Sequence, residues 1–312
     1  IQAKDTNYSI DMNGHDLTIK NEGNAGITVD GKALTFRNGK TTELTADKVG
    51  IEAKNGGNFS THEGGVWNIS AETAAKADGA GSRVSLGAGK IQSTTLAEAS
   101  NGGTISFFVP NDTAATEYVG DVKVNDAAST VTLGIATEGS TWTGGLTNHG
   151  GTFNLGLQNG GVWNNTGKEE ANISLLDATD TGNGVIFQNK DSGGITVDRF
   201  RGHALVLYSH SAADPTDILG GDVTVKKADA NSFLTLRTDR SGINMGDYHG
   251  VENVLDALAK KLTYTDAVNG VSNLNGRVEI AEGLTAASAA KQYATIDFNK
   301  TTGQGSYKKN SM

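Results

Sequence analysis

One four-residue segment has the spacing of a nucleophilic serine. In Asp191-Ser192-Gly193-Gly194, two glycines follow a serine, and the backbone N–H groups of such a loop can form an oxyanion hole. However, Lys190 and Ile195 stand where chymotrypsin-type proteases have Gly and Pro, and no upstream segment resembles their histidine region. The sequence therefore predicts a turn that leads into a strand at Ile195, not a catalytic centre.

The histidines are the next candidates. His203, His210 and Asp214 could form a metal or acid–base cluster if the chain folded back on itself. The two histidines lack the i, i+4 helical spacing of a zinc-binding pair, because His210 follows in a loop. His15 and Asp16 belong to an Asn-Gly-His-Asp segment, which is typical of a turn. We therefore expect structural roles at these positions.

Paired carboxylates would suit the cleavage of polysaccharides. Asp177 with Asp180, or Asp11 with Asp16, could converge on adjacent coils of a repetitive β fold. A glycosidase needs two carboxyl groups about 5 to 9 Å apart on one groove face, but Asp-rich turns produce such pairs by chance. No phosphate-binding glycine loop and no complete calcium loop is present. We therefore assign no catalytic, cofactor-binding or metal-binding residue, and the partner-binding residues stay open.

Short strands must position these residues. From Tyr8 onward, apolar and polar residues alternate in short runs, and Asn-Gly or Asp-Gly turns separate the runs. Three strands with their turns take about 20 to 25 residues, the length of one solenoid coil. Thr61–Ser70 and Leu157–Thr166 share the run Gly-Gly-Val-Trp-Asn, as expected of an internal repeat. We predict an all-β parallel β-helix with Trp142 and Trp163 in its core; an antiparallel sandwich or propeller would have longer strands.

Three segments interrupt the coil pattern. Ala71–Gly81 and Asn111–Tyr118 are polar and rich in alanine, which predicts loops that protrude from the coils. Ser209–Asp217 is a third predicted loop, and it follows the apolar run Gly202–Tyr208, which predicts a buried strand. Protruding loops of solenoids often carry binding specificity, although a plain surface insertion is equally compatible with the sequence.

The pattern changes towards the C-terminus. Apolar residues recur at helical spacing between residues 251 and 262, and Asp247 precedes them as a possible N-cap. We predict coils over residues 1–217 and capping coils, with a short amphipathic helix at 251–262, over residues 218–300. Residues 301–312 have little apolar patterning, which is typical of a frayed end or a linker.

Composition narrows the range of partners. The 312 residues include 35 acidic and 26 basic residues, and the net charge of −9 argues against nucleic acid and anionic lipid. The absence of cysteine is compatible with a bacterial exported protein. No apolar run approaches the roughly 18 residues of a membrane span, so we expect that this chain itself is not inserted in a membrane.

Four segments carry a resemblance to a known family. They are similar to the passenger region of bacterial type V, self-transporting autotransporters: Ser140–Leu155, Asp239–Gly246, Val251–Tyr264 and Gly276–Tyr307. The resemblance implies a right-handed parallel β-helix at the cell surface, exported through an outer-membrane barrel outside this sequence. It also implies a folding nucleus over residues 218–298 and a linker to the barrel over residues 301–312. The protease passengers of that family need the motifs that this sequence lacks.

We therefore expect a cell-surface adhesin passenger that acts in virulence or biofilm formation, without enzymatic activity or a cofactor. Its lateral faces and loops would contact a host surface glycan or protein, or an identical passenger on another cell, and many weak contacts would add by avidity. Release of the passenger from its barrel stays open. Two other functions also stay open: a polysaccharide lyase or glycosidase on the same scaffold, since a fold does not determine a function, and a passive stalk.

Overall fold

The fold is known from a computed structural model that describes residues 1–63, 65–108, 114–179 and 182–308. It consists of two compact units, an N-terminal unit, Ile1–Gly156, and a C-terminal unit, Leu157–Met312. Each unit is a parallel β-solenoid, which confirms the predicted fold class. The domain boundary expected after residue 217 stays a prediction.

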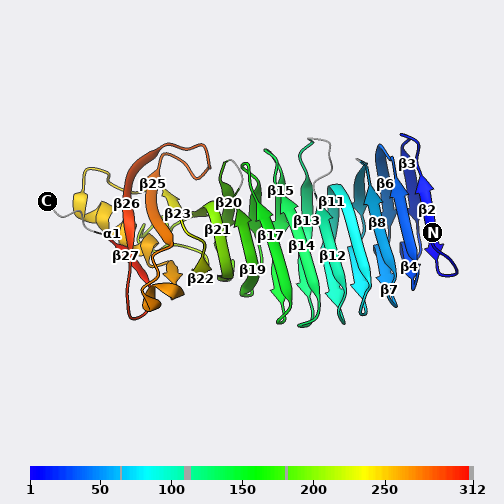
Figure 1. The fold of residues 1–312 in the computed structure, drawn as a ribbon. Helices are drawn as coiled ribbons and strands as arrows, with labels where there is room; N and C mark the ends of the chain where they lie inside the picture. Colours follow the sequence, from blue (N-terminus) through cyan, green and yellow to red (C-terminus); the bar gives the residue numbers. More distant parts are fainter. Residues whose placement is uncertain (64, 109–113, 180–181, 309–312) are drawn as a thin grey trace. The chain divides into compact units, whose positions relative to one another are not determined.

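Each coil of the N-terminal unit has three faces, and each face is a row of parallel strands (Figure 1). The first face holds β3 (Leu17–Asn21), β6 (Thr41–Ala46), β9 (Val66–Ser70), residues 88–92 of β11 (Arg83–Ser100), residues 117–119 of β13 (Glu117–Val124) and β15 (Thr141–Gly144). The second face holds β1 (Gln2–Ala3), β4 (Ala25–Asp30), β7 (Val49–Lys54), β10 (Thr73–Asp78), the ends of β11 and β13, and β16 (Leu146–Asn148). The third face holds β2 (Tyr8–Asp11), β5 (Ala33–Arg37), β8 (Asn58–His62), the beginning of β11, β12 (Thr104–Phe108) and β14 (Thr130–Ile135).

Inward residues of successive coils stack in register. Ile27, Ile51 and Ala75 occupy the same position in β4, β7 and β10, and each is fully buried. Their numbers differ by 24 residues, within the predicted coil length. Such a ladder buries apolar surface that one coil could not bury alone. Asn-Gly pairs with both residues in the left-handed region turn the chain at corners of the coils: Asn13-Gly14, Asn55-Gly56, Asn101-Gly102 and Asn159-Gly160.

The predicted loop at Ala71–Gly81 is wrong. Residues 73–78 form strand β10, in which Ala75 and Ala77 point inward and are fully buried. Alanine is small and apolar enough to fill an inward position, and the alternation of Ala75 and Ala77 with Lys76 and Asp78 is a strand pattern. The predicted loop at 111–118 is wrong from residue 117 onward, where β13 begins, and its residues 111–113 lie outside the described residues.

Aromatic side chains fill the interior, as the sequence predicts. Trp67 meets the rings of Phe36 and Phe59 edge-on, with centroids 5.0 and 5.3 Å away. Trp142 and Trp163 are fully buried, and the Trp142 indole N–H donates to the Gly120 carbonyl at 2.9 Å. A sugar could not stack on either ring from outside, because a stacking platform must be exposed.

The coils of the C-terminal unit have two strand rows. The first contains β18 (Val162–Asn165), β20 (Gly184–Gln188), residues 203–208 of β21 (Ile195–Tyr208), β23 (Ser232–Asp239) and β25 (Leu274–Ala281). The other contains β19 (Ala171–Ala178), residues 195–202 of β21, β22 (Val223–Ala228) and β24 (Leu262–Tyr264). β17 (Thr152–Leu157) spans the boundary between the units. Among the described residues, the coil with three strand rows predicted from the sequence is therefore found in the N-terminal unit.

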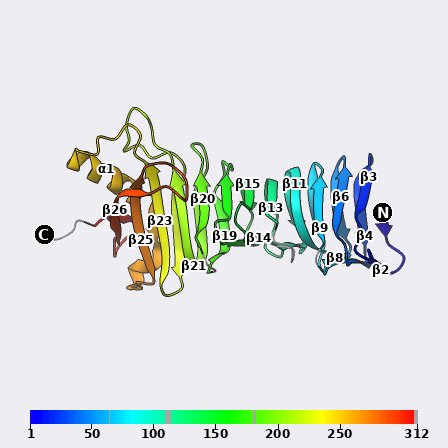
Figure 2. The same cartoon turned by 90° about the horizontal axis from the view of Figure 1, so that it is seen from above.

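One helix, α1 (Tyr248–Ala259), packs on the last strands of the C-terminal unit (Figure 2). Its buried residues are Val251, Val254, Leu255, Leu258 and Ala259, as the helical spacing predicts. The predicted end at residue 262 is wrong, because Leu262 begins β24 after the chain leaves the helix. Asp247 is the N-cap residue, but it binds through its backbone oxygen, which accepts from Val251 N at 3.0 Å, and not through its side chain.

The last strands of the described residues are antiparallel. β26 (Ala290–Phe298) pairs with β25, and β27 (Gly305–Tyr307) pairs with β26. Tyr307 N also donates to the Asp256 carboxylate of α1 at 2.9 Å. The predicted fraying is therefore wrong for residues 305–307, and a linker role for the segment stays a prediction. A short 3-10 helix, Thr265–Asn269, lies between β24 and β25.

Candidate binding groove

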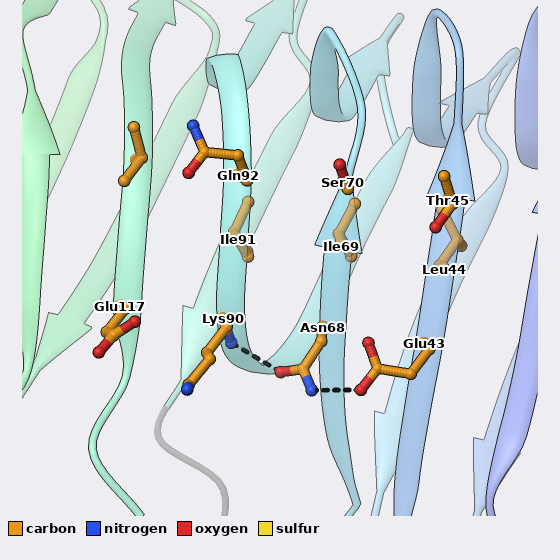
Figure 3. Close-up of a pocket in the computed structure, with 11 residues that line it drawn as sticks. Glu43, Leu44, Thr45, Asn68, Ile69, Ser70, Lys90, Ile91, Gln92 and Glu117 are labelled. Atoms are coloured by element: carbon orange, nitrogen blue, oxygen red, sulfur yellow. Dashed lines mark hydrogen bonds between the residues drawn. The ribbon is translucent and has the colours of Figure 1, made fainter.

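Outward side chains of the first face form a polar surface in the N-terminal unit. Side chains alternate along a strand, so every second residue of β6, of β9, of residues 90–92 of β11 and of residues 117–119 of β13 points away from the core. A groove of about 360 Å³ crosses these four strands, and the buried residues Leu44, Ile69 and Ile91 form its floor. Its other lining residues are Glu43, Thr45, Asn68, Ser70, Lys90, Gln92, Glu117 and Val119 (Figure 3).

These lining residues lie in two rows across the strands. The first row is Glu43, Asn68, Lys90 and Glu117, and the second row is Thr45, Ser70, Gln92 and Val119. Neighbouring strands are about 4.8 Å apart, so each row presents one side chain about every 4.8 Å along the stack. The groove therefore offers regularly spaced hydrogen-bonding groups.

A β-bulge shapes the middle of the groove. Opposite Trp67–Ile69 of β9, β11 uses one residue more, Ala88–Ile91. The Asn68 side chain fills the irregularity, because its Oδ1 accepts from Lys90 N at 2.7 Å and its Nδ2 donates to Glu43 Oε1 at 2.8 Å (Figure 3). Asn68 thus connects three strands and holds the backbone of Lys90 at the groove.

Gly89 makes this arrangement possible. A Cβ atom at residue 89 would lie 2.3 Å from Val66 Cγ1 and 2.5 Å from Asn68 Oδ1. Real Cβ atoms do not approach other atoms so closely, so a larger residue would displace the Asn68 side chain. The bulge and the asparagine therefore depend on glycine at this position.

A second hollow adjoins the groove. It has a volume of about 210 Å³, and its walls include Thr41, Val66 and Ala115. Asn68 and Lys90 line both hollows, so they form the divide between them. A ligand longer than one hollow could therefore pass over these two residues.

The carboxylates of the groove lie far apart. Glu43 and Glu117 are three strand spacings apart, about 14 Å, whereas glycosidase carboxyl groups lie about 5 to 9 Å apart. Lys90 lies between them. Among the residues that the structure describes, neither Lys90 nor Glu117 has an ion-pair partner, so both charges are available to a ligand.

The Ser192 segment forms a turn, as the sequence predicts. Ser192 is buried, and its Oγ donates to the Asn189 carbonyl at 2.6 Å. The Gly193 N–H, which an oxyanion hole would need, donates to the Gly167 carbonyl at 2.9 Å. The serine and its backbone donors are thus occupied by the fold.

The structure does not bring His203, His210 and Asp214 together as one cluster. His203 is exposed on β21 and stacks on the Phe233 ring at 5.1 Å, and Asp214 accepts hydrogen bonds from Thr216, which lower the pKa of its carboxyl group. His210 instead lies 3.4 Å from the carboxylate of Asp239.

A small hollow of about 130 Å³ adjoins His210, and the sequence analysis missed its other members. Asp239 and Ser241 line it, and Ser241 Oγ donates to the Asp239 carboxylate at 2.8 Å. These residues are about 30 positions from His210 in the chain, and only the coil register brings them near it. No motif in the sequence indicates this proximity.

Asp177 belongs to a ladder of ion pairs on the C-terminal unit. Arg201 donates to Asp177 at 2.7 Å, and Arg199 donates to Asp229 at 2.9 and 3.0 Å. Burial opposes ionisation of Asp177, but hydrogen bonds from Arg201 and Thr179 outweigh it and lower the pKa of the carboxyl group. The hydrogen bond to Asp177 raises the pKa of Arg201. Both groups therefore stay charged near neutral pH, whereas a general acid needs a pKa near the working pH.

The remaining carboxylate candidates stabilise turns. Asp11 accepts from Asn13 N and Asn38 Nδ2, and these bonds lower its pKa. Asp16 accepts from Thr41 N at 3.1 Å. The proposed partner of Asp177, Asp180, lies outside the described residues. In the ranges that the structure describes, no cluster of three or more His, Asp or Glu residues could hold a metal ion. No helix in those ranges could span a bilayer, for lack of length and apolarity.

Comparison with known proteins adds no relative. No protein-family model, no curated protein and no solved structure matches this chain. The fold and the groove thus define a parallel β-solenoid with a polar, uncovered groove on one face. Membership of the autotransporter family stays a prediction that depends on the four sequence segments.

Proposed function

We propose that this chain is the adhesive part of a bacterial surface protein and that it holds its ligand in the groove on the first face. The groove carries the proposal, because it presents charged and hydroxyl side chains that the fold leaves free to bind. The β-solenoid scaffold and the resemblance to autotransporter passengers support export to the cell surface.

The geometry of the groove favours adhesion over catalysis. An adhesin needs many modest contacts that add up over a long ligand or over many copies on one cell. Two rows of outward side chains supply such contacts. The polysaccharide lyase or glycosidase function draws less support, because Asp177 is engaged by Arg201 and the groove carboxylates are far apart.

Display of the chain on the surface of a non-adherent bacterium tests the proposal. We expect attachment to host cells or aggregation of the displaying cells, and loss of that attachment in the groove double variant Lys90→Ala/Glu117→Gln. Lys123→Ala, on β13 but on the second face, is the matched control. Each displaying strain is also incubated with polysaccharides in a reducing-sugar assay.

Three outcomes would contradict the proposal. Release of reducing ends by the displayed chain, abolished by Asp177→Asn, would favour the enzyme. If the displaying cells neither attach to any surface nor aggregate, the passive stalk is the remaining function. Attachment that survives the groove double variant would place adhesion elsewhere on the chain.

A further inference from the structure

We propose that the groove binds an uncharged, hydroxyl-rich glycan chain that lies across β6, β9, β11 and β13. This inference rests on the proposed function, and it adds the chemical class of the ligand. The observations that carry it are the donor and acceptor set, the charge of the lining, the saturation of the strand backbones and the spacing of the side-chain rows across the strands.

The lining mixes donors and acceptors at short intervals. Lys90 offers only donors, and Glu43 and Glu117 offer only acceptors. Ser70 and Gln92 offer both. A hydroxyl group can donate and accept at once, so a sugar chain can satisfy each of these groups in turn. A ligand with only acceptors would leave the glutamates unsatisfied, and a ligand with only donors would leave Lys90 unsatisfied.

The charge of the lining argues against a charged polymer. Two glutamates flank one lysine, so the groove has a small net negative charge, and the whole chain has a net charge of −9. A chain of uronic or sialic acids would be repelled by the glutamates and by the surrounding field. A polycation would meet Lys90 at the centre of the groove. A neutral chain meets neither penalty.

The backbone of the groove cannot receive a peptide as an added strand. Strand addition needs a sheet edge with free N–H and C=O groups. β6, β9, β11 and β13 each pair with a strand on both sides, so their backbone groups are already used. Recognition at this face must therefore proceed through side chains, which suits a ligand with polar groups around its whole circumference.

The rows of lining side chains give the ligand a direction. They recur about every 4.8 Å from strand to strand, comparable to the length of one sugar ring. The second hollow extends the site along the strands, beyond Asn68 and Lys90. Lys90 and Glu117 would contact the ligand. Asn68 is a positioning residue, because its Oδ1 holds the backbone of Lys90 at the bulge.

Titration calorimetry of the full chain with defined hexamers tests the inference. The probes are the hexamers of β-linked glucose, α-linked glucose, N-acetylglucosamine and galacturonic acid, together with hexalysine. We expect at least one neutral hexamer to bind and the two charged hexamers not to bind. Lys90→Ala and Glu117→Gln should each weaken that binding about tenfold, whereas Lys123→Ala should leave it unchanged.

Asn68→Ala separates positioning from contact. We expect weaker binding with an unchanged number of sites, and rescue by the double variant Asn68→Asp/Glu43→Gln, in which the new carboxylate can accept from Lys90 N and from the new amide, and the net charge is kept. Circular dichroism confirms that each variant is folded; these side chains are outside the core, so the fold should persist.

The remaining outcomes overturn the inference. Binding of galacturonate or hexalysine in preference to neutral hexamers would show that charge and not hydroxyl groups selects the ligand. The inference is wrong if no neutral hexamer binds. It is also wrong if a hexamer binds but the Lys90 and Glu117 variants leave that binding intact, because the glycan would then lie outside this groove. Attachment of displaying cells without hexamer binding would refute only the glycan inference, and hexamer binding without attachment would refute only the adhesin.

Discussion

The first face of the N-terminal unit and the first row of the C-terminal unit use the same kind of strand in different ways. In the N-terminal unit the outward side chains of β6, β9 and β11 are polar and uncovered. In the C-terminal unit, Val185, Leu205 and Leu207 of β20 and β21 also point outward, yet they are only 2 to 3% exposed. Leu284, from the connection between β25 and β26, packs against them.

A buried ion pair holds that connection in place. Arg237 of β23 donates to the Glu279 carboxylate at 2.8 and 2.9 Å, and both residues are buried. The remaining guanidinium nitrogen donates to the carbonyls of Thr285 and Ala286, at 2.6 and 3.2 Å. The connection thus supplies the acceptors that a buried guanidinium requires.

The comparison shows that the outward face of a row of parallel strands can either be covered and stabilise the fold or stay open to solvent. A covered outward face becomes a second core, and its residues are apolar or paired. An uncovered outward face can keep unpaired polar groups, because water solvates them until a ligand arrives. Coverage, and not strand pairing, distinguishes the stabilising surface from the proposed binding surface.

Removal of Arg237 should have the largest effect on this comparison. We expect Arg237→Ala to lower the free energy of unfolding by about 3 to 4 kcal/mol, because the buried Glu279 carboxylate would lose both hydrogen bonds from Arg237 and keep only its ion pair with Arg277, 2.8 Å away. Urea denaturation measures the change. Lys226→Ala, in the exposed pair with Asp198, should change stability by less than about 1 kcal/mol. Equal effects of the two variants would mean that the connection does not bury the Arg237 pair.

The second-largest loss of stability should come from shortening an apolar side chain on the covered outward face of the C-terminal unit. We expect Leu205→Ala to cost about 2 to 3 kcal/mol, because it removes buried apolar contacts under Leu284. Ser70→Ala, at an outward position of the uncovered face, should change stability by less than about 0.5 kcal/mol. Thermal unfolding followed by circular dichroism compares both variants. A neutral Leu205→Ala would contradict the view that this outward face is a second core.

The ion-pair ladder predicts a pH-dependent contribution. The pKa of Asp177 is lowered in the folded chain, so the carboxylate stabilises the fold above its unfolded pKa of about 3.9. That contribution is lost as the pH falls from about 3.9 through the lower folded value. We expect Asp177→Asn to cost about 1 kcal/mol at pH 7 and much less in strong acid, as measured by urea denaturation at both pH values. If the destabilisation by Asp177→Asn does not depend on pH, it arises from the packing of the side chain and not from its charge.

The smallest effect should come from Asn68. Asn68→Ala removes one side-chain hydrogen bond to Lys90 N and one to Glu43, at a partly exposed position. We expect a loss of only about 0.5 to 1 kcal/mol in the free energy of unfolding, far less than for Arg237→Ala. Thr45→Ala, in the second row, is the near-neutral control. A loss as large as that of Arg237→Ala would make Asn68 a determinant of the fold and not of the groove.

Local patterns predicted much of the fold and little of the groove. Alternation and Asn-Gly turns predicted the coils, and helical spacing predicted α1. The alanines of β10 were misassigned to a loop, because a small residue carries a weak apolar signal although it fits a narrow interior. None of the groove residues was predicted from the sequence. Glu43, Asn68, Lys90 and Glu117 follow one another at intervals of 25, 22 and 27 residues and share no motif.

The sequence by itself determined the length of the coils, the inward and outward residues of strands other than β10, and the burial of Trp142 and Trp163, since these follow from side-chain alternation and the turn preferences of glycine and asparagine. Only the tertiary structure decided which outward residues meet. The bulge at Gly89 and the pairing of Arg237 with Glu279 depend on register between coils 22 to 42 residues apart. Register is a property of stacked strands, so no single strand encodes it.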